Sequence, residues 1–506
     1  MIGTPTAENR TSSLLELCEE SFSGKLIVVS NRGPLEYHIS PEGDLQPRRG
    51  SGSVVTALSV LTNNIELTWV SSAMGDGDRR MAENSQGHSV RSQLHGQRLS
   101  AHFVVTTRRM YHKYYNILCN PLLWFLQHYM WSPPYTPNID SNVYDAWENG
   151  YVPVNKAFAQ AVAEEAKKSD AQMCVMIHDY HLYLVPEFLR AEVPNILIQH
   201  FIHIPWPNPT YWQLLPAYIR NTILRSLCKA DVVGFQTNRD ARSFLESCKT
   251  FLPEAVVDYS QRTIYIDNQT TMVKAYPLSI NVEEVQQIST SPRAQEHEKR
   301  LKTLCGEKTI VRVDRTEPSK NIIRGFKAFE TLLKRHPELQ GRVKFLAFLV
   351  PSRTHIRQYE RYLEETDLVV NNINNSLGSE DWKPITVFYE NNYTQAIASM
   401  RLYDILIVNP IIDGMNLVAK EGPVVNTKNG VLILTESAGA YEQLTKGSLG
   451  VGSADIEGTM QAMYQALTMS QEERQHLNQL LVDSIKDEDV TEWLFRQLQD
   501  LKTLSY

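Results

Sequence analysis

Short runs of β-branched and apolar residues alternate with helical patterns along most of this chain. Strands that are separated by helices pair in parallel and form the sheet of an α/β domain. The alternation therefore predicts an α/β fold built from parallel sheets. The expected strands lie at 25–31, 173–177, 196–202, 232–235, 309–313, 343–350, 385–389, 404–409 and 431–435, with a helix at 154–168.

The chain has 506 residues, which exceeds the usual size of one domain. A polar, proline-bearing region around 287–300 separates the two sets of strands. We therefore expect two Rossmann-like lobes with a junction near 277–300. Ligands of such sheets bind at the carboxyl ends of the strands, so two facing lobes would share one interlobe cleft.

The segment DGMNLVAKE, Asp413 to Glu421, directly follows an apolar run at 404–412. It predicts a strand that ends at Asp-Gly and a helix that begins there, with Glu421 about two turns into the helix. Free N–H groups at a helix start and a glycine that permits close approach favour a phosphate. Glu421 would then face the hydroxyls of a ribose, which indicates a nucleotide-linked substrate. An ordinary strand–turn–helix connection is the alternative that this segment leaves open.

Histidine-containing clusters follow two other predicted strands. The tetrapeptide HDYH, residues 178–181, comes after the strand at 173–177, and His203 comes after the strand at 196–202. A histidine after a buried strand is more often structural than catalytic. Two polar clusters at neighbouring strand ends nevertheless favour chemistry there, because this architecture places its ligands at that edge.

Basic side chains occupy two further strand ends. Arg315 and Lys320 lie just past the strand at 309–313, and Arg353 follows the strand at 343–350. Cations at Arg315 and Lys320 would neutralise a leaving diphosphate while its bond to a sugar breaks. The alternative is a solvated loop that carries surface charges.

Composition excludes several classes of function. The net charge is −7, and no block of Lys and Arg is dense enough for a nucleic-acid partner. The apolar runs are too short and too interrupted to span a membrane. The start of the chain, MIGTPTAENRTSS, lacks the basic flank and apolar region of a secretory signal. The six cysteines lack metal-ligand spacing, so we expect no metal site and buried thiols in a reducing cytoplasm.

Together these motifs resemble those of glycosyltransferase family 20, the trehalose-6-phosphate synthases and their relatives. The resemblance extends from Ser30 to about Leu434 and on to an amphipathic segment at 491–504, with agreement in order and spacing. The motifs are SNRGP (30–34), YYN and LLW (within 114–124), HDYHL (178–182), HIPWP (203–207), GFQT (234–237), the pair Arg315 and Lys320, DGMNLVAKE (413–421) and SAGAYEQL (437–444).

The resemblance implies a GT-B fold with three parts. These are an N-terminal acceptor-binding lobe at 1–277, a C-terminal nucleotide-sugar-binding lobe at 278–485, and a C-terminal helix at 486–506 that crosses back to the first lobe. It also implies a retaining hexosyltransferase that moves a glucosyl unit from UDP-, GDP- or ADP-glucose to a sugar or polyol phosphate. The expected acceptor is glucose 6-phosphate, which gives trehalose 6-phosphate.

The resemblance also implies roles residue by residue. Arg315 and Lys320 would hold the donor diphosphate, His203 would contact the transferred sugar, and Asp179 would contact the acceptor hydroxyls; these four form the expected catalytic group. Glu421 would bind the ribose. The other expected donor-binding residues are Gly52, Asp413, Gly414, Met415, Asn416 and Leu417, and the expected acceptor phosphate pocket comprises Arg32, Tyr115, Trp124 and Arg353.

The chemistry of this family needs no pair of carboxylates of the glycosidase kind. A leaving phosphate oxygen takes the acceptor proton on the same face of the sugar, so the protein supplies positioning and charge stabilisation. We therefore expect a nucleotide-sugar co-substrate and no cofactor, with magnesium at most stimulatory. A homo-oligomer is compatible with the sequence.

Several departures from the family pattern bear on the substrate. RTEPSKN (315–321) stands where trehalose-forming members have R-L-D-Y-x-K-G, and Ile412 replaces the arginine that usually precedes Asp-Gly. The segment at 203–220 is similar to that of validoxylamine phosphate synthase, a pseudo-glycosyltransferase. That activity, a glucosylglycerol-phosphate synthase and a catalytically silent sugar-phosphate-binding regulator are therefore the alternatives to a trehalose-6-phosphate synthase.

Overall fold

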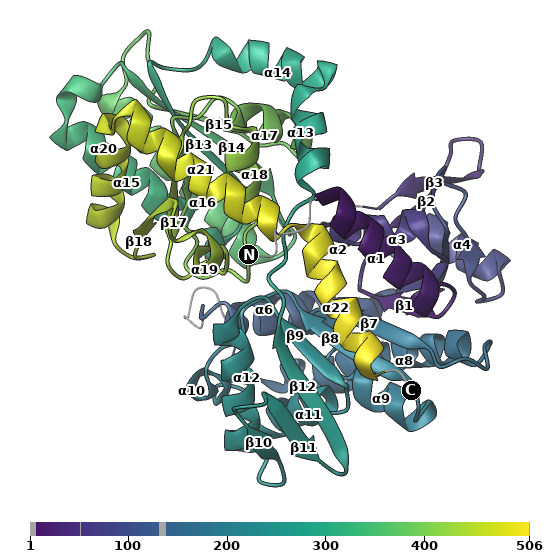
Figure 1. Cartoon of the computed structure of the whole chain (residues 1–506). Coiled ribbons are helices and arrows are strands. Elements are labelled where there is room, and N and C mark those ends of the chain that lie inside the picture. Colours follow the sequence, from purple (N-terminus) through teal and green to yellow (C-terminus); the bar gives the residue numbers. More distant parts are fainter. Residues whose placement is uncertain (1–6, 51, 131–137, 505–506) are drawn as a thin grey trace. The chain divides into compact units, whose positions relative to one another are not determined.

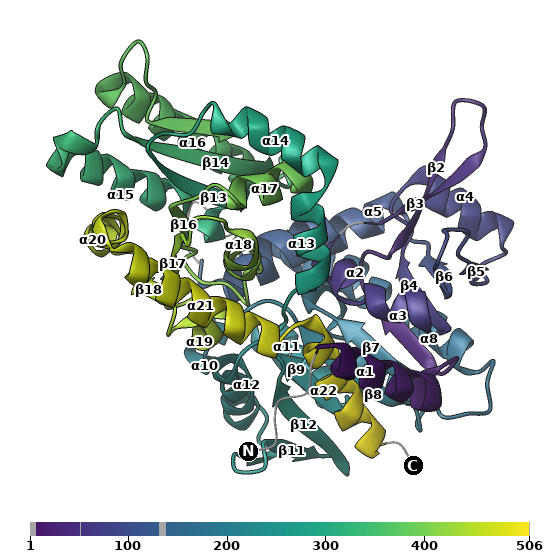
Figure 2. The same ribbon diagram turned by 45° about the horizontal axis from the view of Figure 1, so that its top comes forward.

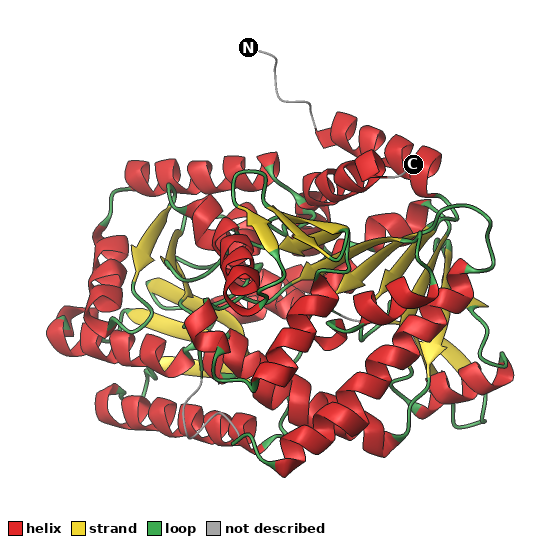
Figure 3. Ribbon diagram, turned by 90° about the horizontal axis from the view of Figure 1, so that it is seen from below, coloured by secondary structure: helices red, strands yellow, loops and turns green. Residues whose placement is uncertain are grey.

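The computed structural model describes residues 7–50, 52–130 and 138–504. The chain divides into two compact units, which we call the first and the second unit. The first unit comprises Met1–Tyr276 together with Thr491–Tyr506, and the second unit is Pro277–Val490. Each unit contains a largely parallel sheet with helices on both sides of its strands (Figure 3), so the predicted α/β class is confirmed.

A ten-stranded sheet lies at the centre of the first unit. Its neighbouring strands pair in parallel from β12 to β6, whereas β10, β11 and β12 form an antiparallel edge and β5 pairs antiparallel with β6. The sequence pattern did not predict these antiparallel strands, nor β4 and β6. In sheet order the strands are β10 (Val256–Asp258), β11 (Thr263–Ile266), β12 (Gln269–Ala275), β9 (Val232–Phe235), β8 (Leu197–Ile202), β7 (Cys174–His178), β1 (Leu26–Val29), β4 (Leu67–Ser72), β6 (Leu99–Val104) and β5 (Val90–Arg91); β2 (Leu35–Ile39) and β3 (Leu45–Arg49) form a separate hairpin.

The C-terminal helix α22 (Val490–Leu504) packs on the sheet of the first unit (Figure 1). Its Trp493 ring meets Phe201 of β8 edge-on at 5.6 Å, and Gln199 donates a hydrogen bond to Gln497 at 3.0 Å. The other helices of this unit are α1 (Ala7–Phe22), α2 (Ser53–Ala57), α3 (Ser59–Asn64), α4 (Asp76–Asn84), α5 (Arg108–Tyr111), η1 (His112–Leu123), α6 (Trp124–Gln127), α7 (Ser141–Ala146), η2 (Trp147–Tyr151), α8 (Val152–Ala166), η3 (Tyr180–Leu182), α9 (Val185–Glu192), α10 (Pro209–Trp212), α11 (Ala217–Leu227) and α12 (Asn238–Phe251).

The second unit is built on a six-stranded sheet in which all neighbouring strands are parallel. Because side chains alternate along a strand, each strand contributes to two apolar layers. Ile310 and Ile405 pack in one core, whereas their neighbours Val311 and Leu406 pack in the other. In sheet order the strands are β15 (Ile385–Phe388), β14 (Val343–Pro351), β13 (Lys308–Thr316), β16 (Ile405–Val408), β17 (Val431–Thr435) and β18 (Ser448–Val451).

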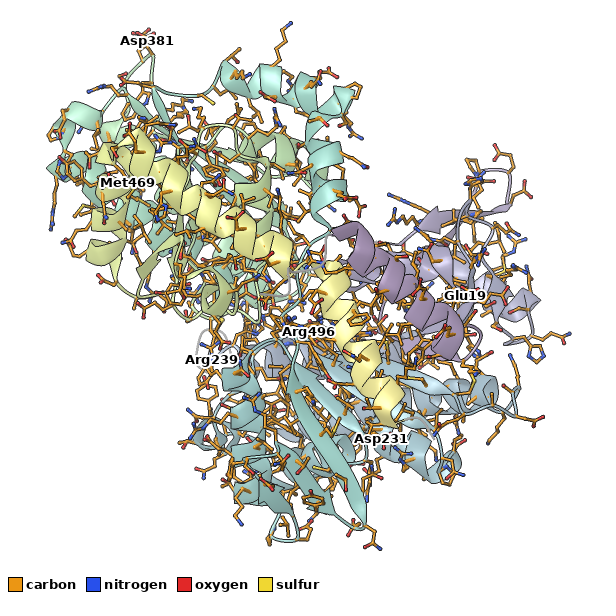
Figure 4. The ribbon with its side chains drawn as sticks, viewed as in Figure 1. Glu19, Asp231, Arg239, Asp381, Met469 and Arg496 are labelled. Carbon is orange, nitrogen blue, oxygen red and sulfur yellow. The ribbon has the colours of Figure 1, made fainter. Side chains whose placement is uncertain are left out.

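Two sets of helices cover the two faces of this sheet (Figure 2). One core contains side chains of α15, α16 and α20; the other contains side chains of α13, α14, α17, α18, α19 and α21. Met469 marks the turn between α20 and α21, and Asp381 lies in the loop between α16 and β15 (Figure 4). The helices are α13 (Val282–Thr290), α14 (Pro292–Lys302), η4 (Pro318–Lys320), α15 (Ile322–Arg335), η5 (Pro337–Leu339), α16 (Arg357–Leu377), α17 (Tyr393–Met400), α18 (Val418–Val425), α19 (Ala440–Leu444), α20 (Ile456–Thr468) and α21 (Gln471–Asp487).

Two further observations concern membrane-spanning helices and the cysteines. Within the described ranges, no helix is both long enough and apolar enough to cross a bilayer. All six cysteines are free; five are buried, as predicted, and Cys305 is half-buried.

Candidate active site

Lys320 and Asp413 form an ion pair at the carboxyl edge of the second unit's sheet. Lys320 ends the short helix η4 that follows β13, and its carbonyl accepts a hydrogen bond from Arg312 at 2.7 Å. Asn416 also donates to Asp413, at 3.1 Å. Burial alone would lower the pKa of Lys320, but Asp413 and neighbouring carboxylates reverse this and raise the pKa. The lysine is therefore held as a cation beside the DGMNLVAKE segment.

Arg315 lies within β13, not beyond it. The strand continues to Thr316, where Arg315 is in register with Val350 of β14, so the prediction that Arg315 follows the strand was wrong. The apolar pattern stops at Val313, but backbone pairing with β14 continues through the polar residues. The Arg315 side chain is half-exposed at this edge.

Glu317 forms ion pairs with both Arg315 and Arg353. Its carboxylate is fully buried and lies 2.9 Å from Arg315 Nη2 and 3.4 Å from Arg353 Nη1. Arg353 also donates to the hydroxyl of Tyr359 at 2.8 Å, and its guanidinium lies 5.4 Å from the centre of that ring. The structure thus brings together two arginines that the sequence assigned to different substrates.

The DGMNLVAKE segment differs in one respect from its prediction. Helix α18 begins at Val418 with Leu417 as its N-cap, so Asp413 to Leu417 form a loop and Glu421 lies in the first turn. The predicted helix start at Asp-Gly was wrong because Asn416 adopts a left-handed backbone conformation, with φ of 80°, that interrupts a helix.

Backbone hydrogen bonds fix this loop. The carbonyl of Asp413 accepts from Gly439 N at 3.0 Å, and the carbonyl of Met415 accepts from Ala440 N at 2.9 Å. Glu421 is 9% exposed, and its carboxylate accepts a hydrogen bond from Tyr393 at 2.8 Å. Burial raises the pKa of Glu421, and the Tyr393 hydrogen bond opposes that rise.

In the first unit, Asp179 and His203 meet at the carboxyl ends of β7 and β8. Asp179 has φ of 77°, and its Oδ1 accepts from the backbone N–H of His203 at 3.2 Å. His203 Nε2 lies 3.1 Å from His178 Nδ1. Burial, with His200 adding to it, lowers the pKa of His203 to about 3, so the ring is neutral near pH 7. This constellation can form hydrogen bonds to a sugar without carrying a positive charge.

Arg32 lies in the loop after β1, and the aromatic residues of the expected phosphate pocket, Tyr115 and Trp124, belong to a group of aromatic rings. Tyr115 stacks between Tyr111, at 5.5 Å, and His181, at 5.8 Å. Burial raises the pKa of Tyr111, Tyr115 adds to the rise, and the Arg32 guanidinium opposes it. Trp124 is 5% exposed.

Gly50 and Gly52 are each required to be glycine, but for different structural reasons. A Cβ at Gly50 would lie 2.1 Å from the carbonyl oxygen of Gly33, so this position has no room for a side chain. Gly52 is exposed and has open space around it, but its φ of 141° is one that side-chain-bearing residues rarely adopt. Gly52 is the N-cap of α2, and its carbonyl accepts a hydrogen bond from Thr56 N at 3.0 Å.

Sequence reasoning missed Glu317, Tyr359 and Tyr393, which contact the predicted residues directly. Glu317 lies inside RTEPSKN, and an acid two residues after Arg315 was an available signal. Tyr359 lies six residues after its partner Arg353, whereas Tyr393 is 28 residues from Glu421 and meets it only through tertiary folding. Among the described residues, no group of three or more His, Cys, Asp or Glu is arranged to hold a metal ion.

Two Rossmann-like units with charged groups at the carboxyl edges of their sheets define an α/β protein of the GT-B class. The family model of glycosyltransferase family 20 matches residues 24–503. The chain therefore belongs to glycosyltransferase family 20.

Relatives of known identity include two trehalose-phosphate synthases. An "Alpha,alpha-trehalose-phosphate synthase [UDP-forming] A" of Dictyostelium discoideum is 30% identical over 96% of this chain, which spans 64% of that protein's length. An "Alpha,alpha-trehalose-phosphate synthase [UDP-forming] 2" of Aspergillus niger is 32% identical over 89% of this chain and 91% of its own. A UDP-forming trehalose-phosphate synthase of Burkholderia xenovorans, solved with glucose-6-phosphate, is 26% identical with a TM-score of 0.81, covering 94% of this chain and 100% of that one.

Proposed function

We propose that this protein transfers a glucosyl unit from UDP-glucose to glucose 6-phosphate, forming trehalose 6-phosphate with retention at the anomeric carbon. The observation that carries the proposal is the Lys320–Asp413 pair at the carboxyl edge of the second sheet, with Arg315 and Glu421 at the same edge. A cation held there suits the charge that develops on a leaving diphosphate. Relatives named UDP-forming support uridine as the nucleoside.

The second unit would bind the donor. Lys320 and Arg315 would neutralise the diphosphate, and Glu421 would accept hydrogen bonds from the ribose hydroxyls. The loop formed by Asp413, Gly414, Met415, Asn416 and Leu417 would contact the transferred sugar and its phosphate. The family resemblance is the ground for assigning Gly52 to donor binding as well. Backbone bonds from Gly439 and Ala440 already order this loop, which lowers the entropic cost of binding.

The first unit would bind the acceptor. Arg32, Tyr115 and Trp124 would serve its phosphate, because guanidinium groups bind phosphate through paired hydrogen bonds. The family resemblance is the ground for assigning Arg353 to an acceptor phosphate as well. Asp179 would accept from an acceptor hydroxyl, and neutral His203 would contact the transferred sugar. The phosphate oxygen that leaves would take the acceptor proton, so these residues position rather than attack.

We further propose that the protein needs no resident cofactor, that magnesium acts only through the diphosphate, and that the location is a reducing cytoplasm. The free state of all six cysteines supports that location. The proposal also includes the assembly of identical chains into a homo-oligomer.

A matrix of nucleotide sugars against phosphorylated acceptors tests the function. UDP-, GDP- and ADP-glucose would each be combined with glucose 6-phosphate, glycerol 3-phosphate and an amino-cyclitol phosphate, with product identified by mass and anomeric coupling. Trehalose 6-phosphate with two α-linkages is the expected product. A cyclitol product or a glycerol glucoside would replace this function by one of its relatives. Absence of nucleotide release with every pair would indicate a silent regulator.

A further inference from the structure

A tyrosine outside the sequence motifs contacts the carboxylate proposed to bind ribose. Tyr393 is the first residue of α17, at the carboxyl end of β15, and Glu421 lies in the first turn of α18. The Tyr393 hydroxyl donates to Glu421 Oε1 at 2.8 Å. These residues are 28 positions apart, so their contact depends on how the two helices pack.

The burial of the two side chains is unequal. Tyr393 is 46% exposed, whereas Glu421 is 9% exposed. An exposed tyrosine normally satisfies its hydroxyl with water, but here the hydroxyl turns inward to a carboxylate. Within the described part of the chain no hydrogen bond reaches Glu421 Oε2, so one oxygen is held and the other is available to a ligand.

We propose that Tyr393 is a positioning residue for the nucleotide: its hydroxyl holds Glu421 Oε1 and so presents Oε2 to a ribose hydroxyl. This inference rests on the proposed function, because it assumes that Glu421 receives the ribose. A carboxylate fixed before the ligand arrives loses less rotational freedom on binding, and this saving appears as affinity.

The surrounding charges support this role. Burial raises the pKa of Glu421, and the hydrogen bond from Tyr393 lowers it, so the hydroxyl helps to keep the carboxylate ionised. Lys420, the neighbour on α18, donates instead to the carbonyl of Leu278 at 2.7 Å, and burial lowers its pKa to about 7. Burial and Glu421 raise the pKa of Tyr393, and Glu284 on α13 is a second carboxylate that raises it. Tyr393 is thus the hydrogen-bond donor that compensates for burying Glu421.

A role for Tyr393 in blocking the nucleotide predicts the opposite effect of its removal on nucleotide affinity. If the Tyr393 hydroxyl occupied the place of a ribose hydroxyl, it would have to leave before the nucleotide binds. Removing it would then strengthen nucleotide binding instead of weakening it.

The test compares Tyr393→Phe with Tyr389→Phe, a matched control from the same stretch of chain. Tyr389 also donates to a carboxylate, Asp367 Oδ1 at 2.5 Å, but that pair is not part of the proposed site. Calorimetric titration with UDP should show about tenfold weaker binding for Tyr393→Phe, as expected when a hydrogen bond to a charged group is lost. Tyr389→Phe should bind UDP like the wild type.

Three further readouts separate positioning from a general structural effect. Tyr393→Phe should raise the apparent KM for UDP-glucose without changing that for glucose 6-phosphate. The acidic limb of UDP binding should move to higher pH, because Glu421 loses the bond that favours its ionised form. In a Glu421→Gln background, Tyr393→Phe should have little additional effect, since it acts through Glu421.

Failure of the role proposed for Tyr393 can be distinguished from failure of the proposed function. UDP binding by Tyr393→Phe that equals or exceeds that of the wild type overturns the role of Tyr393, and so does an equal loss in Tyr389→Phe. If wild-type protein binds none of UDP, GDP and ADP, the proposed function fails, and the inference fails with it.

Discussion

Replacing Lys320 with methionine keeps the length of the side chain and removes the cation that contacts Asp413. The two side chains are 11% and 15% exposed, so the pair is largely shielded from water. Removal of the lysine leaves the half-buried Asp413 carboxylate without this cation, while its hydrogen bond from Asn416 remains. The variant should therefore affect both stability and catalysis.

The expected magnitudes follow from burial. Breaking a buried ion pair by deleting one partner typically costs about 3–5 kcal/mol, and the residual exposure of this pair places it near the lower limit. A domain of about 200 residues loses roughly 2–4 °C in Tm per kcal/mol, so Tm should fall by about 6–12 °C. Loss of a preorganised cation at developing charge should lower kcat by about two to three orders of magnitude.

The difference in the free energy of unfolding between the wild type and Lys320→Met should depend on pH. Burial raises the pKa of Asp314, and Arg312 and Lys320 oppose that rise. Without Lys320, the folded-state pKa of Asp314 moves further above its unfolded value of about 3.9. A carboxyl group with a raised folded pKa costs stability when it is ionised, and the cost disappears as it takes up a proton. The difference in the free energy of unfolding between the wild type and the variant should therefore become smaller as pH falls from 7 towards 4.

Differential scanning calorimetry at pH 7.5 and pH 5, combined with initial-rate kinetics, checks both effects. Lys327→Met is the control, because Lys327 is exposed on α15. Turnover by Lys320→Met within threefold of the wild type would refute the assignment of the diphosphate site. A stability gap that stays constant across this pH range would refute the electrostatic explanation.

Three other predictions concern the acceptor, the histidines and metals. Arg353→Ala should raise the apparent KM for glucose 6-phosphate strongly, while free glucose should be nearly inert with the wild type; equal turnover of both acceptors would exclude the phosphate pocket. Burial lowers the pKa of His200 and His203 to about 3, so denaturant unfolding should show stability falling as pH drops below about 6.5. His200→Asn should reduce that dependence, and an unchanged slope would argue against neutral buried histidines. EDTA should leave at least part of the transfer activity in a coupled UDP-release assay; complete loss restored by magnesium would show a required metal.

The sequence predicted features that depend on local pattern. The α/β class follows from alternation of apolar runs and helical periodicity, which operates over about ten residues. The positions of Lys320, His203 and Arg353 near sheet edges follow because parallel strands direct their carboxyl ends to the same side. Antiparallel β10 and β11 were missed because short edge strands carry a weak apolar pattern.

The sequence pattern also predicted the wrong starting residue for helix α18. The segment after 404–412 was predicted to begin a helix at Asp-Gly, yet the helix begins only at Val418. Contacts of Asp413 and Met415 with the 439–440 turn hold the intervening loop outside helical geometry. Gly414 and Asn416 are themselves poor helix formers, so the tertiary contacts and the local propensity act in the same direction here.

The sequence alone determined which chemical groups this protein carries and at which strand ends they occur. Only the tertiary structure decided their partners: Glu317 between Arg315 and Arg353, and Tyr393 on Glu421. These pairs are 2 to 36 residues apart, and the distant ones meet because separate β–α connections end at the same sheet edge. Which groups are charged at neutral pH depends on burial and on those partners, and neither is a property of local sequence.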